Sequence, residues 1–130
     1  LEDTILKHIL DNPRVDTLYA NEGDEGVRRI LPKVRAAGVR VCTFGLETPE
    51  AGLWADQIEP QRLENGKMGG AMVVKRGASE LGRVTVSLPG IYNLSNLLGA
   101  LCVALDMGVD FDSARTGMAS FSGLLATRSW

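Results

Sequence analysis

Two carboxamide side chains, Asn93 and Asn96, have the chemistry and the spacing to recognise a flat heterocyclic base. They follow Pro89-Gly90 and stand three positions apart, so on a helix both project from the same side. A carboxamide carries a donor and an acceptor together, which matches the N6/N7 edge of adenine. Tyr92 could pack on a ring or ribose, or be a partly buried structural tyrosine. Asn93 could equally be a helix N-cap, whose side-chain oxygen accepts a backbone N–H.

A strand-to-helix junction positions these side chains. Residues 83–88 alternate polar and apolar, which is typical of a half-buried strand. A helix is expected over residues 93–107, with a buried stripe of leucines at helical spacing: Leu94, Leu97, Leu98, Leu101 and Leu105. Because the first N–H groups of a helix lack partners within it, polar recognition is expected at the start of this helix.

The rest of the chain predicts further helices and strands. Helical patterns cover residues 1–12, 27–37 and 112–121, the last with Asp112 as N-cap. Buried strands at 15–20 and 39–44 flank a helix, which implies a right-handed parallel crossover. An antiparallel meander is expected from strands 55–63, 71–76 and 83–88. The predicted fold class is α/β, with a parallel part, a small antiparallel meander and two C-terminal helices.

Two local features of the parallel part carry expectations of their own. Residues 21–26 form a polar, glycine-containing loop at the carboxyl end of the first strand. Ligands bind at such places in open α/β sheets, but a plain strand-to-helix turn explains the same composition. Pro32 lies inside the helix expected at 27–37 and should kink it or separate its first turn.

The overall composition excludes several classes of function. A formal net charge of −2 with dispersed lysines and arginines lacks the electrostatic footprint of a nucleic-acid or membrane-surface protein. No apolar run is long enough to span a membrane, and no signal peptide opens the sequence. Cys42 and Cys102 lie far apart in apolar segments and are expected to be buried free thiols in a reducing compartment.

No catalytic centre or metal site can be assembled from the residues. The sole histidine, His8, lies on the first predicted helix, without a serine, cysteine or carboxylate arrangement around it. Gly66-Lys67 is not part of a phosphate-binding loop, because Gln61 stands where the motif needs glycine and Met68 where it needs Ser or Thr. Three carboxylates near the last helix are expected to be caps or solvated surface: Asp106, Asp110 and Asp112.

The segment Pro89-Gly90-x-Tyr92-Asn93-x-x-Asn96-x-x-Gly99-Ala100 resembles the central domain of the bacterial Mur ligases, whose pattern there is P-G-x-H/F/Y-N-x-x-N-A-x-A-A. Further similarities follow in the family's order. They are Asn21-Glu22-Gly23-Asp24 for N-A-D-D, Phe44-Gly45, Ala55-Asp56, Met107-Gly108-Val109, Phe121-Ser122-Gly123-Leu124 and Arg128. The L-alanine-adding ligase and the murein-peptide ligase look most similar, through Phe44-Gly45 and Leu88-Pro89-Gly90.

The resemblance implies an ATP-dependent, cytoplasmic ligase of peptidoglycan synthesis. In that family ATP phosphorylates a carboxylate of a UDP-N-acetylmuramic acid precursor, and the amine of an amino acid or peptide displaces the phosphate. Adenine contacts are expected from Asn93 and Asn96, with Tyr92 nearby and Arg128 as a further nucleotide contact. The phosphate loop and the Mg²⁺ ligands lie upstream in the family, so residues 1–130 are expected to contain no catalytic residue or metal ligand.

This chain begins at Leu1, not Met, and we expect it to be the C-terminal portion of such a domain, inactive alone. Two other functions stay open. Gly23 in place of an aspartate and Tyr92 in place of the histidine usual in alanine-adding enzymes favour a non-catalytic module that binds a nucleotide or a protein. A folylpolyglutamate-type ligase would share the central fold.

Overall fold

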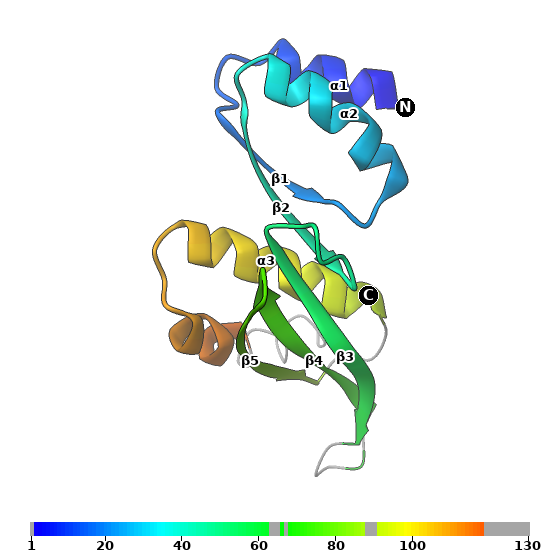
Figure 1. Cartoon of the computed structure of the whole chain (residues 1–130), viewed down its shortest axis with the longest axis vertical. Helices are drawn as coiled ribbons and strands as arrows, with labels where there is room; N and C mark the ends of the chain where they lie inside the picture. Colours follow the sequence, from blue (N-terminus) through cyan, green and yellow to red (C-terminus); the bar gives the residue numbers. More distant parts are fainter. Residues whose placement is uncertain (1, 63–65, 67, 88–90, 119–130) are drawn as a thin grey trace.

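A five-stranded mixed sheet with helices on both faces forms the fold (Figure 1). The computed structural model describes residues 2–62, 66, 68–87 and 91–118. In chain order the elements are α1 (Glu2–Leu10), β1 (Thr17–Asn21), α2 (Glu25–Ala36), β2 (Arg40–Leu46), β3 (Leu53–Arg62), β4 (Met68–Arg76), β5 (Ser79–Val86) and α3 (Ile91–Asp106). A further helix runs over residues 111–118.

The strands follow their order in the sequence, β1-β2-β3-β4-β5. The pairs β1–β2 and β2–β3 are parallel, whereas β3–β4 and β4–β5 are antiparallel. The predicted parallel crossover and the predicted meander are therefore both confirmed, as is the α/β fold class. The β2–β3 pairing is short and joins only Phe44–Leu46 to Leu53–Ala55, so the first half of β2 has no strand beside it on the β3 side.

The alternation of side chains along β1 and β2 explains why helices cover both faces. Leu18 and Val41 pack in one cluster with Leu6, Ile30 and Val34 of α1 and α2. Their neighbours Tyr19 and Cys42 pack on the opposite side, against the cluster that contains α3. Successive residues of a strand face opposite ways, so the parallel half of the sheet is covered on both faces.

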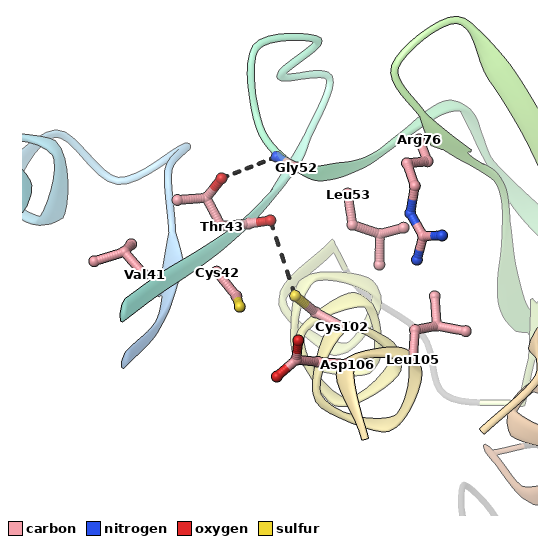
Figure 2. Close-up of a pocket in the computed structure, with 9 residues that line it drawn as sticks. All are labelled: Val41, Cys42, Thr43, Gly52, Leu53, Arg76, Cys102, Leu105 and Asp106. Carbon is pink, nitrogen blue, oxygen red and sulfur yellow. Dashed lines mark hydrogen bonds between the residues drawn. The ribbon is translucent and has the colours of Figure 1, made fainter. Parts of the chain in front are cut away.

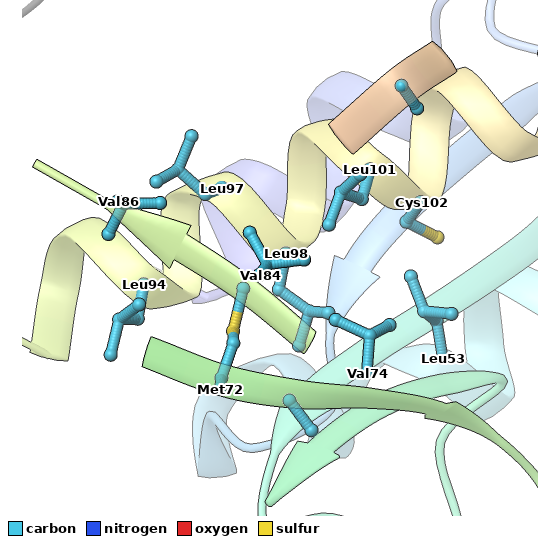
Figure 3. Packing of buried hydrophobic residues seen from close by; sticks show 12 residues of the cluster. Leu53, Met72, Val74, Val84, Val86, Leu94, Leu97, Leu98, Leu101 and Cys102 are labelled. Atoms are coloured by element: carbon cyan, nitrogen blue, oxygen red, sulfur yellow. The ribbon is translucent and has the colours of Figure 1, made fainter. Parts of the chain in front are cut away.

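The main core lies between α3 and the antiparallel half of the sheet. Figure 3 shows leucines of α3 directed toward Met72, Val74, Val84 and Val86 of β4 and β5. Leu98 and Leu101 are fully buried, and Leu94 and Leu97 nearly so. The predicted stripe of α3 is thus confirmed, with Leu105 partly buried at its end. Among the described residues, no helix is both long and apolar enough to cross a membrane.

The structure corrects three local predictions. Pro32 does not separate the first turn of α2, which is one helix of 12 residues. The proline is exposed while Ile30, Leu31 and Val34 are buried, so packing of the inner face holds the helix together. The N-cap of the last helix is Asp110, not Asp112, because the Asp110 carboxylate accepts the N–H of Ser113 at 3.1 Å.

The strand β5 begins earlier than predicted, at Ser79 instead of residue 83. A tight turn at Gly77, with φ of +61°, leads directly into pairing of Ser79 with Arg76. Residues 77–82 are polar and rich in glycine, and the sequence therefore predicts a turn. Strand pairing is made by backbone hydrogen bonds, however, so an edge strand can form whatever side chains it carries. Leu88 and residues 119–121, which belong to predicted elements, lie outside the described residues.

Candidate functional site

The carboxamides Asn93 and Asn96 lie in the first turns of α3, as the spacing predicts. Because α3 begins at Ile91, Asn93 lies inside the helix and is not its N-cap. Asn93 is half-buried and Asn96 is exposed. Tyr92 belongs to the same turn through its backbone, while its side chain and Arg128 lie outside the described residues.

Between the two asparagines, Ser95 joins α3 to the end of β1. The Asn21 side-chain nitrogen donates a hydrogen bond to Ser95 Oγ at 3.3 Å. At about 100° per residue, Ser95 faces a different side of the helix from Asn93 and Asn96. The structure therefore joins Asn21 to α3 through Ser95, and not through either of the two carboxamides.

In that loop, residues 21–24, two polar side chains have local structural roles. Asn21 accepts a hydrogen bond from the N–H of Gly23 at 2.9 Å, and Asp24 caps α2 by accepting from Val27 at 3.1 Å. These contacts support the interpretation as a strand-to-helix turn. Glu22 differs, because its Oε2 is buried without a hydrogen-bond partner among the described residues. Nothing in the sequence distinguishes Glu22 from its acidic neighbours.

The end of β2 fits closely against this loop and against α3. A Cβ added at Gly45 would come within 2.7 Å of Thr48 Oγ1 and 3.2 Å of the Gly23 nitrogen. A Cβ added at Gly99 of α3 would come within 2.8 Å of the Phe44 ring. Both glycines therefore permit contacts that a side chain would obstruct. The ends of β1 and β2 and the first turns of α3 form one packed region, which we call the strand-end junction.

At the opposite end of α3, Asp106 is the centre of a polar cluster that sequence reasoning missed. It was expected to be a cap or solvated surface, and the residue is indeed exposed, although its side chain is only 18% exposed. Tyr19 donates a hydrogen bond to Asp106 Oδ2 at 2.6 Å, and Arg40 contacts both carboxylate oxygens, one at 2.8 Å. The three residues lie on β1, β2 and α3, so no spacing in the sequence indicates the cluster.

This cluster shifts the acidity of its members in opposite directions. The hydrogen bonds from Arg40 and then Tyr19 hold the pKa of Asp106 well below its usual range. The same hydrogen bond to Asp106 raises the pKa of the Tyr19 hydroxyl above its ordinary value. The cluster is therefore a charged carboxylate with a matched guanidinium, and not a proton donor or acceptor poised near neutral pH.

The two cysteines lie beside this cluster and are both free thiols. Cys102 is buried as expected. Cys42 is only half-buried, so the prediction of a buried thiol is wrong for Cys42. Burial raises the pKa of the Cys102 thiol to about 11 and also raises that of Cys42. Neither thiol is a ready nucleophile at neutral pH.

The described residues contain no group of three or more His, Cys, Asp or Glu side chains that could hold a metal ion. What the strand-end junction offers is a pair of carboxamides on one helix turn, one of them accessible, which can bind a ligand but not transform it.

Comparison with known proteins identifies the fold and the family. The family model described as the Mur ligase middle domain matches residues 4–104. The chain is 35% identical over 98 residues to a UDP-N-acetylmuramate–L-alanine ligase of Chlorobium phaeobacteroides, covering 75% of this chain and 19% of that protein. It is 32% identical over 124 residues to the ligase of the same name from Desulforapulum autotrophicum, covering 95% of this chain and 25% of that protein.

Solved structures show the same fold at lower identity. The UDP-N-acetylmuramate:L-alanyl-gamma-D-glutamyl-meso-diaminopimelate ligase from Neisseria meningitides matches with a TM-score of 0.63 and 20% identity, over 88% of this chain and 32% of that one. MurF from Acinetobacter baumannii matches with a TM-score of 0.59 and 18% identity, over 87% of this chain and 22% of that one. The chain spans about a fifth to a quarter of the curated relatives named above. The match over residues 4–104 shows that the chain belongs to the Mur ligase middle-domain family.

Proposed function

We propose that this chain is the C-terminal portion of the middle domain of an ATP-dependent, cytoplasmic ligase of peptidoglycan precursor synthesis. In this proposal Asn93 and Asn96 hold the adenine ring of ATP, with Tyr92 and Arg128 as further nucleotide contacts. Family membership supports the type of reaction, and the similar L-alanine ligases favour a UDP-N-acetylmuramic acid substrate. The reaction joins a carboxylate of that substrate to the amine of an amino acid or peptide.

The observation that carries the proposal is the pair of carboxamides in the first turns of α3. Asn96 is exposed, and its side chain makes no hydrogen bond to another described residue. Asn93, one turn earlier on the same side, is half-buried and therefore better held in place. A base lying along this side of α3 would meet the donor and the acceptor of the exposed Asn96, with Asn93 one turn earlier.

The chain's own residues would bind and orient the nucleotide in this proposal, while other parts of the protein would provide the chemistry. Phosphoryl transfer requires Mg²⁺ and cationic groups around the phosphates. In this proposal those groups come from other segments of the protein, as they do in the family that the chain belongs to.

Asparagine substitutions in the full-length protein test the adenine role. Each of N93A and N96A is expected to raise the KM for ATP about tenfold, since a bidentate contact to a base edge contributes roughly 1–3 kcal/mol. The turnover number should change less, because the adenine is remote from the reacting phosphate. Preference for ATP over GTP should fall in parallel. Steady-state kinetics with UDP-N-acetylmuramate and L-alanine provide the measurement.

Asn12→Ala is a matched control, because it removes a carboxamide at the end of α1, away from α3. It should leave the KM for ATP unchanged. Unaltered kinetics in both N93A and N96A would contradict the adenine role. Measurable ATP binding without ligation of any amino acid would instead support the non-catalytic module, and activity with folates would support the folylpolyglutamate-type ligase.

A further inference from the structure

A cavity of about 290 Å³ lies between β2, the start of β3 and the last turns of α3 (Figure 2). In the described part of the chain β3 pairs only with the end of β2, so residues 41–43 have no described strand on that side, which is where the cavity lies. Its volume is close to the lower end of the range for small-molecule sites in proteins. It lies beside Asp106, at the opposite end of α3 from Asn93 and Asn96.

The walls of this cavity combine apolar surface with polar groups and two charged side chains. Leu53 and Leu105 provide aliphatic surface, together with the thiols of Cys42 and Cys102. The charged groups are Asp106 and Arg76. Figure 2 shows the Arg76 guanidinium directed toward the space between Leu53 and Leu105.

The two charges of the cavity are not equivalent. Arg40 contacts both oxygens of Asp106, and Tyr19 donates a further hydrogen bond, so the negative charge of Asp106 is already matched. Within the described part of the chain, Arg76 forms no ion pair and its side chain makes no hydrogen bond. The cavity is therefore lined by an exposed arginine that has no ion-pair partner in the described part of the chain, beside the aliphatic surface of Leu53 and Leu105.

We propose that this cavity binds a small monocarboxylate with an apolar body. The carboxylate would meet the Arg76 guanidinium, whose planar donors match its two oxygens. The apolar body would cover Leu53 and Leu105 and the thiol of Cys102. A single negative charge is favoured over a phosphate dianion, because the carbonyl end of α3 contributes negative potential nearby.

The bound carboxylate would also shield Cys42, the half-buried thiol of the cavity. The Cys102 thiol is held more deeply, where it donates a weak hydrogen bond to the Thr43 carbonyl at 3.9 Å. The rate at which Cys42 is alkylated therefore reports occupancy of the cavity without any dependence on ligase activity.

The probe is 3-phenylpropionate, titrated into the full-length protein and followed by ligand-observed NMR. Saturable binding is expected with a dissociation constant of a few millimolar or tighter, in line with the affinity of ligands of this size. The uncharged 3-phenylpropionamide should bind at least fivefold more weakly. Bound 3-phenylpropionate should also slow alkylation of Cys42 by iodoacetamide in alkaline buffer, where more of this thiol is ionised despite its raised pKa, measured by peptide mass spectrometry.

Substitution of Arg76 tests the charge contact. R76Q should weaken the binding of 3-phenylpropionate at least fivefold without changing the affinity for the amide. R76K should restore part of the lost affinity. Arg35→Gln is the matched control, since it removes an exposed guanidinium from α2, away from the cavity. It should bind like the parent protein.

Three results would overturn the proposal: no saturable binding, equal affinity for acid and amide, or equal affinity in R76Q and R35Q. Competition by ATP would also overturn it, because the cavity would then belong to the nucleotide site. Failure of the adenine role in N93A and N96A leaves these outcomes untouched, so the two proposals can be judged separately.

Discussion

The two ends of α3 are both polar, but they are organised in different ways. At its start, Asn93 and Asn96 are neighbours on one helix turn, and the accessible Asn96 has no partner among the described residues. At its end, Asp106 is bonded to residues 87 and 66 positions away, Tyr19 and Arg40. The first arrangement leaves a carboxamide free for a ligand, whereas the second uses its polar groups to fasten the helix to the sheet. A candidate binding site differs from a structural cluster in having polar groups without protein partners, and not in having more polar groups.

The middle of α3 connects the two ends mechanically. Leu98 is fully buried against the sheet, and Gly99 lies against the Phe44 ring at the strand-end junction. Any substitution that loosens this packing should affect both ends at once, whereas substitutions at the ends should separate stability from nucleotide binding.

Leu98→Ala is expected to have the largest effect. Truncating a fully buried leucine removes apolar contacts and leaves a cavity, which costs about 2–5 kcal/mol of unfolding free energy. Denaturant unfolding followed by circular dichroism measures the loss. The exposed leucine of α1, Leu10, is the control, and L10A should stay within about 0.5 kcal/mol of the parent. Equal losses in both variants would show that α3 does not carry the core.

Asn21→Ala should have an intermediate effect, by weakening the attachment of α3 to β1. The variant loses the hydrogen bonds to Ser95 and from Gly23, and we expect a loss of about 1–2 kcal/mol in unfolding free energy. Asn96→Ala, on the same helix turn, should change stability by less than about 0.5 kcal/mol, because its side chain is exposed. A larger loss in N96A than in N21A would reverse the roles assigned to the two sides of α3.

Asp106→Asn should have the smallest effect at neutral pH, because its partner Arg40 is 58% exposed and solvent screens the ion pair. The pH dependence of this contribution to the free energy of unfolding has a defined direction. The pKa of Asp106 is depressed in the folded state, so its contribution is present above the unfolded value of about 3.9 and is lost as the pH falls below it. The stability difference between the parent and D106N should therefore shrink below about pH 4 in denaturant titrations.

Exposed Asp11 on the same molecule is the control for charge loss, and D11N should lie within about 0.5 kcal/mol of the parent at neutral pH. A difference between the parent and D106N that stays constant down to about pH 2 would contradict the assigned ion pair. D106N should also leave the KM for ATP unchanged, whereas N93A and N96A should raise it.

Much of the fold was predictable from local patterns, for identifiable reasons. The leucines of α3 recur at the helical period, and Val84 and Val86 alternate with polar residues on β5, so each element indicated its own buried face. Predictions failed where local chemistry is ambiguous. The first residues of β5 look like a turn, and Pro32 looks like a helix breaker, but backbone pairing and inner-face packing decided otherwise.

By itself the sequence determined the order of helices and strands, the leucine face of α3, and the family through Asn93, Asn96 and their flanking residues. These depend on residues close together in the chain, whose spacing carries the information. Only the tertiary structure decided that Asn93 is not an N-cap, that Asp106 joins Tyr19 and Arg40, and that a cavity lined by Arg76 lies beside them. Those features arise from strand pairing and helix packing between distant segments, because contacts formed only on folding leave no periodic trace in the chain.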